Sequence, residues 1–439
     1  MAWKKVKLGD IIKPIKNHIE ISDDVEYKQV TIKLWGKGIK LRGLKYGSEI
    51  KVKRQNVAKN GDFIISKIDA RHNAFGFISD ELDDSIVSND FPLFEVNLKL
   101  VRLDFFKELV KLPLFEDFCK KASSGTTNRI RLSIPKFLNI DLIIPVDFIE
   151  QEKIFNKLQS TKYCFDNFKL NFENQQNYIK KLRESILQEA VQGKLVEQNS
   201  SDESAEILFE KIRKEKEQLI KDKKIKKEKP LPEISADEIP YELPSGWKWC
   251  RLGDVVRFID YRGKTPTKTD YGVRLLTAKN VKKGFINLNP EEFISVETYN
   301  NYMTRGFPKK NDILITTEAP LGNVANLILD EKVAFAQRVI ILQDYISLNK
   351  IFLKYVLLSK YFQNLLIFNQ SGMTAKGIKS SRLKNLLVPL PPLEEQKRIV
   401  KKVDSLMSFC DILESEVLFS KKSAEDLMQS VLREAFSEK

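Results

Sequence analysis

Short loops rich in cationic, amide and hydroxyl side chains occur in both halves of this sequence. Arginine, lysine and threonine can donate hydrogen bonds to phosphate oxygens, and arginine, asparagine and lysine can also read base edges in a nucleic-acid groove. In the first half the candidates are Arg71, His72, Asn73, Thr126, Thr127, Arg129 and Arg131. In the second half they are Arg262, Lys264, Thr265, Lys279, Asn280, Arg338, Thr374, Lys376 and Lys379. The alternative for each is an ordinary solvated basic loop.

The loops that follow Ser123 and Ser371 are the stronger candidates, because small flexible residues beside cations suit a close approach of the backbone to a ligand. The overall charge agrees with a polyanionic partner. The 439 residues carry a formal net charge of +14, which favours nucleic acid or an anionic membrane surface.

The composition bounds the environment of the chain. No apolar run is long enough for a transmembrane helix, and the N-terminus lacks an apolar signal core. The cysteines are far apart and form no metal-type or redox pair. They are Cys119, Cys164, Cys250 and Cys410. We therefore expect a cytoplasmic protein without a membrane partner.

Motifs for catalysis are not found. The glycines around Lys37 lack the rest of a phosphate-binding loop, and there is no G-x-S-x-G nucleophile elbow. The only histidines are His18 and His72, so a histidine-based metal site is disfavoured. We assign no catalytic and no metal-binding residue, which favours a binding protein over an enzyme.

Two long stretches, Gln151–Ala190 and Gln396–Ala435, have apolar residues at alternating spacings of four and three. The first series is Ile154, Leu158, Thr161, Phe165, Phe168, Phe172, Gln175, Ile179, Leu182 and Ile186. The second is Ile399, Val403, Leu406, Cys410, Leu413, Val417, Ser420, Ala424, Leu427 and Val431. A 3.5-residue period predicts a coiled-coil seam, on helices roughly 60 Å long. The alternative is two ordinary amphipathic core helices.

The two stretches are copies of one element, because both of their ends are 245 residues apart. The globular segments repeat too. The segment that begins at Trp247 repeats the one at Trp3, and the apolar run Asp312–Thr316 repeats Asp62–Ser66. This self-similarity predicts a tandem duplication of a globule followed by a helix. Between these landmarks the globules differ, which favours one scaffold with two recognition surfaces; drift after duplication is the alternative.

We expect an α+β fold, with two mixed α/β domains and two long helices that pair antiparallel about a pseudo-two-fold axis. The expected segments are a first domain at 1–149, a helix at 150–195, a linker at 196–245, a second domain at 246–393 and a helix at 394–439. The linker has a thin apolar stripe, a lysine run at Lys221–Lys229 and several prolines. It predicts a solvated helix and an extended connector, with contact to a phosphate backbone as the alternative.

These features together resemble the DNA-specificity (S) subunit of a type I restriction-modification system, over nearly the full length. The motifs that carry the resemblance are Pro-Leu-Pro-Pro-Leu-Glu-Glu-Gln-Lys-Arg-Ile at Pro389–Ile399, Leu-Arg-x-Ser-Ile-Leu-Gln-x-Ala at Leu182–Ala190, and Glu-Leu-Pro-x-Gly-Trp-Lys-Trp at Glu242–Trp249. One departure is the entry to the first helix at Ile144–Gln151, which lacks the proline cluster of the second copy.

The resemblance implies that each globule is a target-recognition domain reading one half of a bipartite site in double-stranded DNA. It also implies that the helices set the half-site spacing. The chain would bind no cofactor itself. It would recruit two methyltransferase (modification) subunits, which use S-adenosylmethionine, and restriction subunits, which need ATP and Mg. The assembled complex would be a DNA adenine methyltransferase and an ATP-dependent endonuclease. Two alternatives stay open: a restriction or modification enzyme with an unrecognised active site, and a coiled-coil scaffold with an incidental basic surface.

Overall fold

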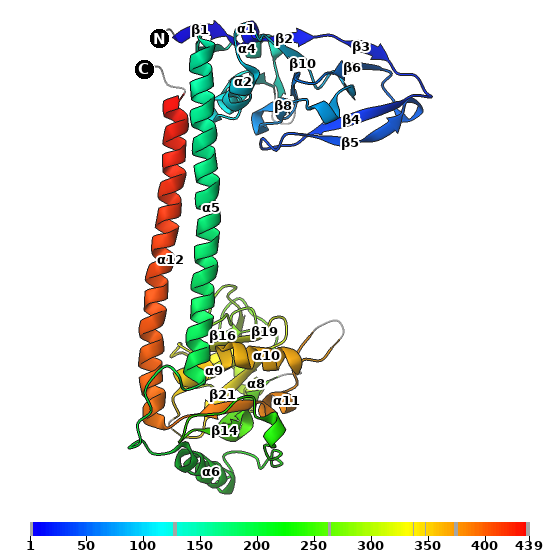
Figure 1. The fold of residues 1–439 in the computed structure, drawn as a ribbon. Coiled ribbons are helices and arrows are strands. Elements are labelled where there is room, and N and C mark those ends of the chain that lie inside the picture. Colours follow the sequence, from blue (N-terminus) through cyan, green and yellow to red (C-terminus); the bar gives the residue numbers. More distant parts are fainter. Residues whose placement is uncertain are drawn as a thin grey trace. The chain divides into compact units, whose positions relative to one another are not determined.

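The computed structural model describes residues 3–125, 130–261, 265–336, 338–346, 348–372 and 376–435, and Figure 1 labels their elements. These residues form two compact units. The first contains the described residues up to Phe172 and those from Phe419 onward, and the second runs from Glu173 to Leu418. Two long helices, α5 (Phe148–Val191) and α12 (Leu393–Ala435), contribute one part to each unit.

The first unit holds an α+β domain built mainly from short strands. Its strands are β1 Trp3–Lys7, β2 Ile12–Ile15, β3 His18–Glu20, β4 Glu26–Ile32, β5 Ile39–Tyr46, β6 Arg54–Ala58, β7 Phe63–Ile65, β8 Phe75–Phe77, β9 Ser85–Val87, β10 Leu93–Val96, β11 Ser123–Ser124, β12 Arg131–Leu132 and β13 Asp141–Pro145. Its helices before α5 are α1 Leu8–Ile11, η1 Gly47–Glu49, η2 Ala70–His72, η3 Asp80–Leu82, α2 Leu103–Leu109, α3 Pro113–Lys121 and α4 Ile134–Leu138.

A four-stranded sheet, in the order β2-β10-β7-β8, carries the core of this domain. Phe63 is fully buried at its centre. The rings of Phe77, Phe94 and Phe115 lie 5.3, 6.1 and 6.0 Å from its ring, distances typical of favourable aromatic pairs. A second sheet, in the order β3-β6-β9-β4-β5, extends from it. Short β-type runs at Asp62–Ser66 and Leu93–Val96, separated by glycine, asparagine and aspartate residues, predict the strands β7 and β10.

The second unit repeats the same frame. Its strands are β14 Lys248–Arg251, β15 Val256–Asp260, β16 Val273–Leu276, β17 Phe293–Ile294, β18 Ile313–Thr317, β19 Leu321–Asn326, β20 Val333–Phe335, β21 Val339–Asp344 and β22 Leu387–Leu390. Its helices, apart from α5 and α12, are α6 Ala205–Lys221, η4 Ala236–Glu238, α7 Leu252–Val255, α8 Val296–Tyr302, α9 Lys350–Leu358, α10 Lys360–Phe368 and α11 Ser380–Asn385.

Both domains have the same sheet order. In the second domain β15-β21-β18-β19 corresponds to β2-β10-β7-β8 in the first. In each domain the first strand also pairs antiparallel with the last, as β1 with β13 and as β14 with β22. The inserted sheets differ, with five strands in the first domain and three, β17-β16-β20, in the second. The duplicated frame and its unlike insertions thus agree with the sequence.

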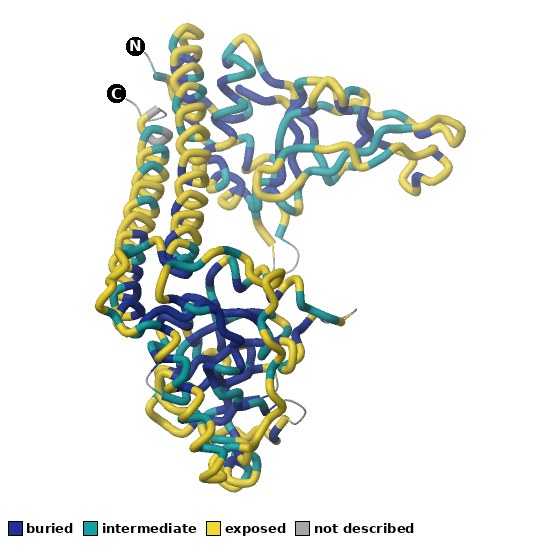
Figure 2. Tube along the Cα trace, turned by 60° about the horizontal axis from the view of Figure 1, so that its bottom comes forward, coloured by how far each residue is buried: buried dark blue, intermediate teal, exposed yellow. Residues whose placement is uncertain are grey.

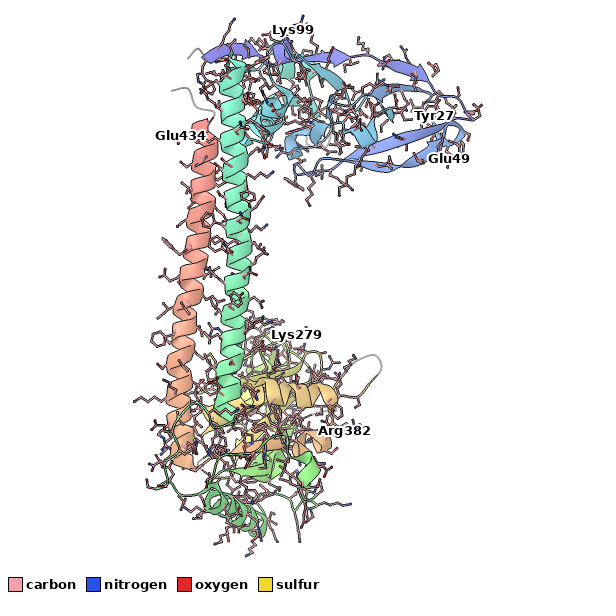
Figure 3. The ribbon with its side chains drawn as sticks, viewed as in Figure 1. Tyr27, Glu49, Lys99, Lys279, Arg382 and Glu434 are labelled. Carbon is pink, nitrogen blue, oxygen red and sulfur yellow. The ribbon has the colours of Figure 1, made fainter. Side chains whose placement is uncertain are left out.

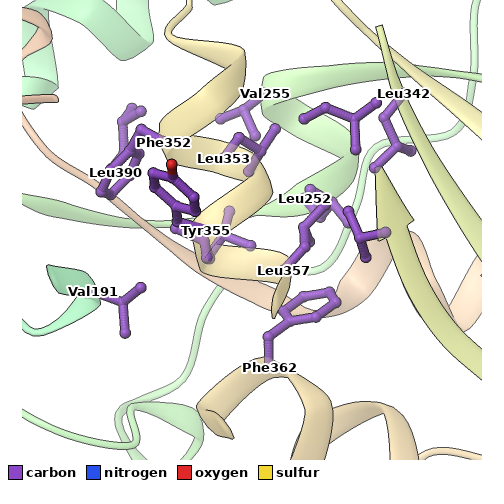
Figure 4. Packing of buried hydrophobic residues seen from close by; sticks show 14 of the residues in the cluster. Val191, Leu252, Val255, Leu342, Phe352, Leu353, Tyr355, Leu357, Phe362 and Leu390 are labelled. Atoms are coloured by element: carbon purple, nitrogen blue, oxygen red, sulfur yellow. The ribbon is translucent and has the colours of Figure 1, made fainter. Parts of the chain in front are cut away.

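The core of the second unit joins the sheet to helices from distant parts of the chain. Figure 4 shows Leu342 of β21 near Leu353 of α9 and Leu252 of α7, with Val191 at the end of α5 in the same cluster. Phe362 of α10 completes it and is fully buried. Figure 2 shows that buried residues concentrate in the sheets, whereas long stretches of α5 and α12 are exposed.

A buried glutamine begins each long helix in the same way. Gln151 donates to the carbonyl of Pro145 at 2.9 Å and accepts from the amide of Arg102 at 2.7 Å. Gln396 donates to the carbonyl of Pro391 at 2.9 Å and accepts from the amide of Asn349. Arg102 and Asn349 each precede a core helix. The repeated Glu-Gln motif therefore ties the start of each long helix to its own domain, because a buried amide needs partners for both of its polar atoms.

The linker differs from the solvated connector expected from its sequence. α6 forms as predicted, but Leu208 and Ile212 are 3% and 1% exposed and belong to the core of the second unit. The proline-containing part is held by Arg251, whose guanidinium donates to the carbonyls of Pro232 and Glu233. Few apolar residues are enough to bury α6 against the core, because an amphipathic helix packs through only one face.

The pairing of α5 with α12 is antiparallel within each unit. In the second unit the end of α5 shares a core cluster with the beginning of α12, and Arg183 lies 2.6 Å from Asp411 and 3.1 Å from Glu414. In the first unit Lys157, near the start of α5, lies 3.9 Å from Glu434 of α12.

The seam between the helices is narrower than predicted. Positions spaced by seven residues are buried or partly buried; they include Leu158, Phe172, Ile179, Ile186, Val403 and Cys410. The second predicted position of each heptad is mostly exposed, as at Phe168, Gln175, Leu182, Leu413, Ser420 and Leu427. Two helices alone cover only a thin strip of each other's surface. A second apolar stripe therefore stays open on the paired helices.

Candidate nucleic-acid interface

The hairpin β11–β12 holds the candidate loop of the first domain. Ser123 pairs with Leu132, whose amide donates to the carbonyl of Lys67 at 2.8 Å. This bond fixes the hairpin to the residues that follow β7. Arg131 is exposed and lies 3.0 Å from Asp90. The predicted contacts Thr126, Thr127 and Arg129 lie outside the described residues.

The segment Arg71–Asn73 occupies a tight turn beside α3. Asn73 has a φ of +56°, a region that asparagine adopts more readily than most residues, and its amide donates to Glu116 at 2.7 Å. Hydrogen bonds from Lys120 and Asn73 hold the pKa of Glu116 below its usual value. The buried Nε of Arg71 has no hydrogen-bond partner among the described residues.

These two loops meet at the end of β7. The amide of Ser66 donates to the carbonyl of Ala74 at 2.9 Å, and the next residue, Lys67, accepts from the β11–β12 hairpin. The structure thus brings Arg71, His72 and Arg131 to one edge of the domain, although some 60 residues of sequence separate them.

The candidate loop of the second domain is attached at the end of β18, the strand equivalent to β7. Ser371 and Gly377 exchange backbone hydrogen bonds of 2.8 and 3.0 Å, and the amide of Ile378 donates to the carbonyl of Thr317 at the end of β18. A Cβ atom at position 377 would lie 2.9 Å from the Cβ of Glu318, so a glycine is required for this close approach.

Three of the predicted contacts surround this point. Arg338 has a φ of +78°, its carbonyl accepts from the amide of Thr317, and its Nε lies 2.7 Å from Glu318. Lys376 and Lys379 are exposed on the loop and just after it. The arrangement offers cations at a docked loop, where they can contact phosphates.

The other predicted contacts of the second domain include one buried residue, two exposed residues and three that the structure does not describe. Asn280 is 1% exposed, and its amide donates to the carbonyls of Asn287 and Pro290 at 3.0 Å each. It therefore stabilises a turn, and we leave it out of the proposed contacts. Its neighbour Lys279 is exposed, as Figure 3 shows, and so is Thr265. Arg262, Lys264 and Thr374 lie outside the described residues.

One basic surface was not predicted from the sequence; it lies on β4, β5 and the turn between them. Trp35, in this turn, is 63% exposed, and its ring lies 5.2 Å from the ring of His72. The exposed cations are Lys33, Lys37, Lys40, Arg42 and Lys45. The alternation of cations with apolar residues at Lys33–Arg42 was the available signal, but exposed tryptophans are rarely distinguishable from core residues by type.

Within the described ranges, no group of three or more histidine, cysteine, aspartate or glutamate side chains is placed to hold a metal ion. No single helix among these residues is long and apolar enough to cross a membrane. The bent helix pair α9–α10 would together be long and apolar enough, by length and composition only.

The chain is similar to known proteins in sequence and in structure. Residues 244–418 match the family model described as "Type I restriction modification DNA specificity domain". The chain is 37% identical to the type I restriction enzyme EcoAI specificity subunit of Escherichia coli, over 55% of this chain and 42% of that subunit. It is 25% identical to the MjaVIII specificity subunit of Methanocaldococcus jannaschii, over 98% of this chain and 92% of that protein. The chain thus spans less than half the length of the EcoAI relative.

Two solved structures share the fold. The HsdS subunit from Thermoanaerobacter tengcongensis has a TM-score of 0.57 at 21% identity, with 99% of this chain and 96% of that chain covered. A chain from "Structural basis underlying complex assembly and conformational transition of the type I R-M system" has a TM-score of 0.63 at 19% identity, with 99% and 97% covered.

Proposed function

Because this chain belongs to the DNA-specificity subunits of type I restriction-modification systems, we propose that it is the non-catalytic, sequence-reading component of such a complex. Each domain reads one half of a bipartite, asymmetric site in double-stranded DNA. The observation that carries this proposal is one frame with two sets of loops. In each domain a basic loop is hydrogen-bonded to the backbone at the end of an equivalent strand, β7 in the first domain and β18 in the second. The inserted sheets of the two domains differ. A shared frame gives both domains one docking mode, and unlike loops give them unlike base contacts.

The long helices serve two roles in this proposal: they set the half-site spacing, and they dock two methyltransferase subunits. The open apolar stripe supports the second role. In the second unit Phe409 and Leu413 are 60% and 47% exposed, four residues apart on one face of α12. An exposed apolar face on a long helix suits packing against partner helices. S-adenosylmethionine, ATP and Mg belong to the partner subunits in this proposal, and restriction subunits complete the assembly.

Methylation sequencing of the host genome, with and without this gene, tests the function directly. We expect one gene-dependent motif made of two unlike half-sites separated by unspecified bases. The affinity of the complex for this motif should fall steeply with salt, because neutralised phosphates release counterions. A single continuous palindrome would contradict the proposal. Methyl transfer to DNA by the purified chain alone would instead show an enzyme.

Replacing Phe409 and Leu413 with aspartate tests the docking role. We expect the double variant to lose roughly tenfold or more in affinity for the modification subunit, because charged groups would enter an apolar contact. Its melting temperature should stay near that of the wild type, since both side chains are exposed. Ser415→Asp, on an exposed serine of the same helix, is the control for added charge. Normal assembly by the double variant would remove this face from the partner surface.

A further inference from the structure

The hairpin of β4 and β5 has an unusual charge distribution. Within the described residues, none of Lys33, Lys37, Lys40, Arg42 and Lys45 makes an ion pair, although other cations of the same domain, such as Lys53 and Lys59, do. Between Glu26 and Tyr46 the only carboxylate is Glu26 itself. Like charges held close together destabilise a ribbon unless a counter-charge is supplied. The described residues therefore supply no ion-pair partner for these five cations.

The pairing pattern makes the outer part of this hairpin a two-stranded ribbon. β4 and β5 pair from Glu26–Tyr46 to Ile32–Ile39, whereas β4 meets β9 only at Gln29. Val30, Ile32 and Ile39 pack against the domain core, so the intervening residues face away from it. A register shift beside Gln29 marks a bulge, a feature that re-aims side chains. Lys40, next to Ile39, therefore faces away from the core, and Arg42, which the bulge leaves without a Cα partner on β4, is also exposed.

The turn is docked where the candidate loops meet. The amide of Trp35 donates to the carbonyl of His72 at 2.7 Å, and the amide of Gly36 donates to the carbonyl of Asn73 at 3.1 Å. Trp35 has a φ of +63°, which is strained for a bulky residue and persists only where the surroundings hold it. The Trp35 indole is thus kept in solvent beside His72, at the edge proposed above for DNA contact.

We infer that the β4–β5 ribbon is a DNA-reading element of the first domain. Its cations contact phosphates on both sides of the major groove, and Trp35 contacts base edges. A two-stranded ribbon fits the major groove, and apolar side chains there can read a thymine methyl group. The second domain has only the sheet β17-β16-β20 at the corresponding insertion, so this contact belongs to one half-site. The inference rests on the proposed function, and it names which surface performs it.

Variants of the ribbon separate the two parts of this inference. Lys40→Gln/Arg42→Gln should weaken binding to all sequences and reduce the salt slope by about two, one per lost phosphate contact. Trp35→Ala should weaken binding to the cognate duplex by roughly 5- to 100-fold, and Trp35→Phe should keep most of the affinity. Replacing thymine with uracil in the first half-site should weaken the wild type but not Trp35→Ala.

The measurement is fluorescence anisotropy with the full chain and its co-expressed modification subunits, at several salt concentrations. Lys99→Gln is the control; Lys99 is exposed and lies apart from Tyr27 of the ribbon in Figure 3. Circular dichroism of each variant checks folding. If the wild type binds its motif and the folded variants bind equally well, the ribbon assignment is overturned, and a defect only in subunit assembly would make it a protein-docking surface. Absence of selective binding by the wild type would instead overturn the proposed function.

Discussion

Replacing Arg251 with methionine will lower the free energy of unfolding of the second unit by about 3 kcal/mol, since several stranded hydrogen-bonding groups cost about 1 kcal/mol or more each. The Arg251 side chain is only 5% exposed. It donates to the carbonyls of Pro232, Glu233 and Asn385 and to both oxygens of Glu238, at 2.8 to 3.1 Å. Methionine fills the volume but removes the donor to the three carbonyls, whereas Glu238 keeps its hydrogen bonds from Ser235.

Urea unfolding of both proteins measures this loss, and Arg274→Met is the matched control. Arg274 also pairs with two carboxylates, Glu291 and Glu331, but both are 53% exposed. Water can solvate them after the substitution, so we expect a loss below about 1 kcal/mol. Equal losses in the two variants would show that Arg251 does not hold the linker.

The contact between Arg251 and Glu238 also makes part of the free energy of unfolding of the second unit sensitive to acid. The hydrogen bond from Arg251 lowers the pKa of Glu238 to about 2. A carboxylate with a depressed pKa in the folded state stabilises the fold above its unfolded value near 4.5, and this contribution is lost as the pH falls toward 2. The stability difference between wild type and Arg251→Met should therefore narrow between pH 6 and pH 2.5. Partial exposure of Glu238 keeps the effect small.

The long helices show what a periodic pattern can and cannot predict. The 3.5-residue period predicted both helices within a few residues, because long regular patterns dominate over local propensities. It did not predict that Phe168 and Leu413 are exposed at 54% and 47%. The period indicates that two positions of each heptad are apolar. How many of these positions are buried depends on how many helices pack together. The exposed stripe is therefore the surface that the proposed methyltransferase subunits would cover.

Loop residues were predicted less well than helices, because the type of a residue does not show whether its side chain points into the fold or into solvent. Asn280 has the chemistry for reading adenine, yet its amide is consumed by a turn. Trp35 has the composition of a core residue, yet it is exposed at a docked turn. Gln151 and Gln396 begin the two repeated stretches, but their role depends on backbone groups that no side-chain pattern reveals.

Replacing Lys350 with methionine will destabilise the second unit by roughly 3–5 kcal/mol, the cost of leaving a buried charge without its partner. Lys350 lies 2.9 Å from both Asp312 and Asp344. Asp312 is fully buried. Burial opposes the charge of Lys350, but the hydrogen bonds to Asp312 and Asp344 outweigh it and raise its pKa above the usual 10.5. The pair therefore contributes fully at neutral pH and is lost only as the pH rises beyond that value.

A double-mutant cycle isolates this ion pair. Asp312→Asn removes the stranded charge, so Lys350→Met/Asp312→Asn should be more stable than Lys350→Met alone, with a coupling energy of about 0.5–3 kcal/mol. Lys310→Met is the control, since Lys310 and its partner Asp330 are 53% and 74% exposed, and we expect a change within about 0.5 kcal/mol. If the double variant were as unstable as the sum of the single variants, the lysine would act through packing of its alkyl chain and not through charge.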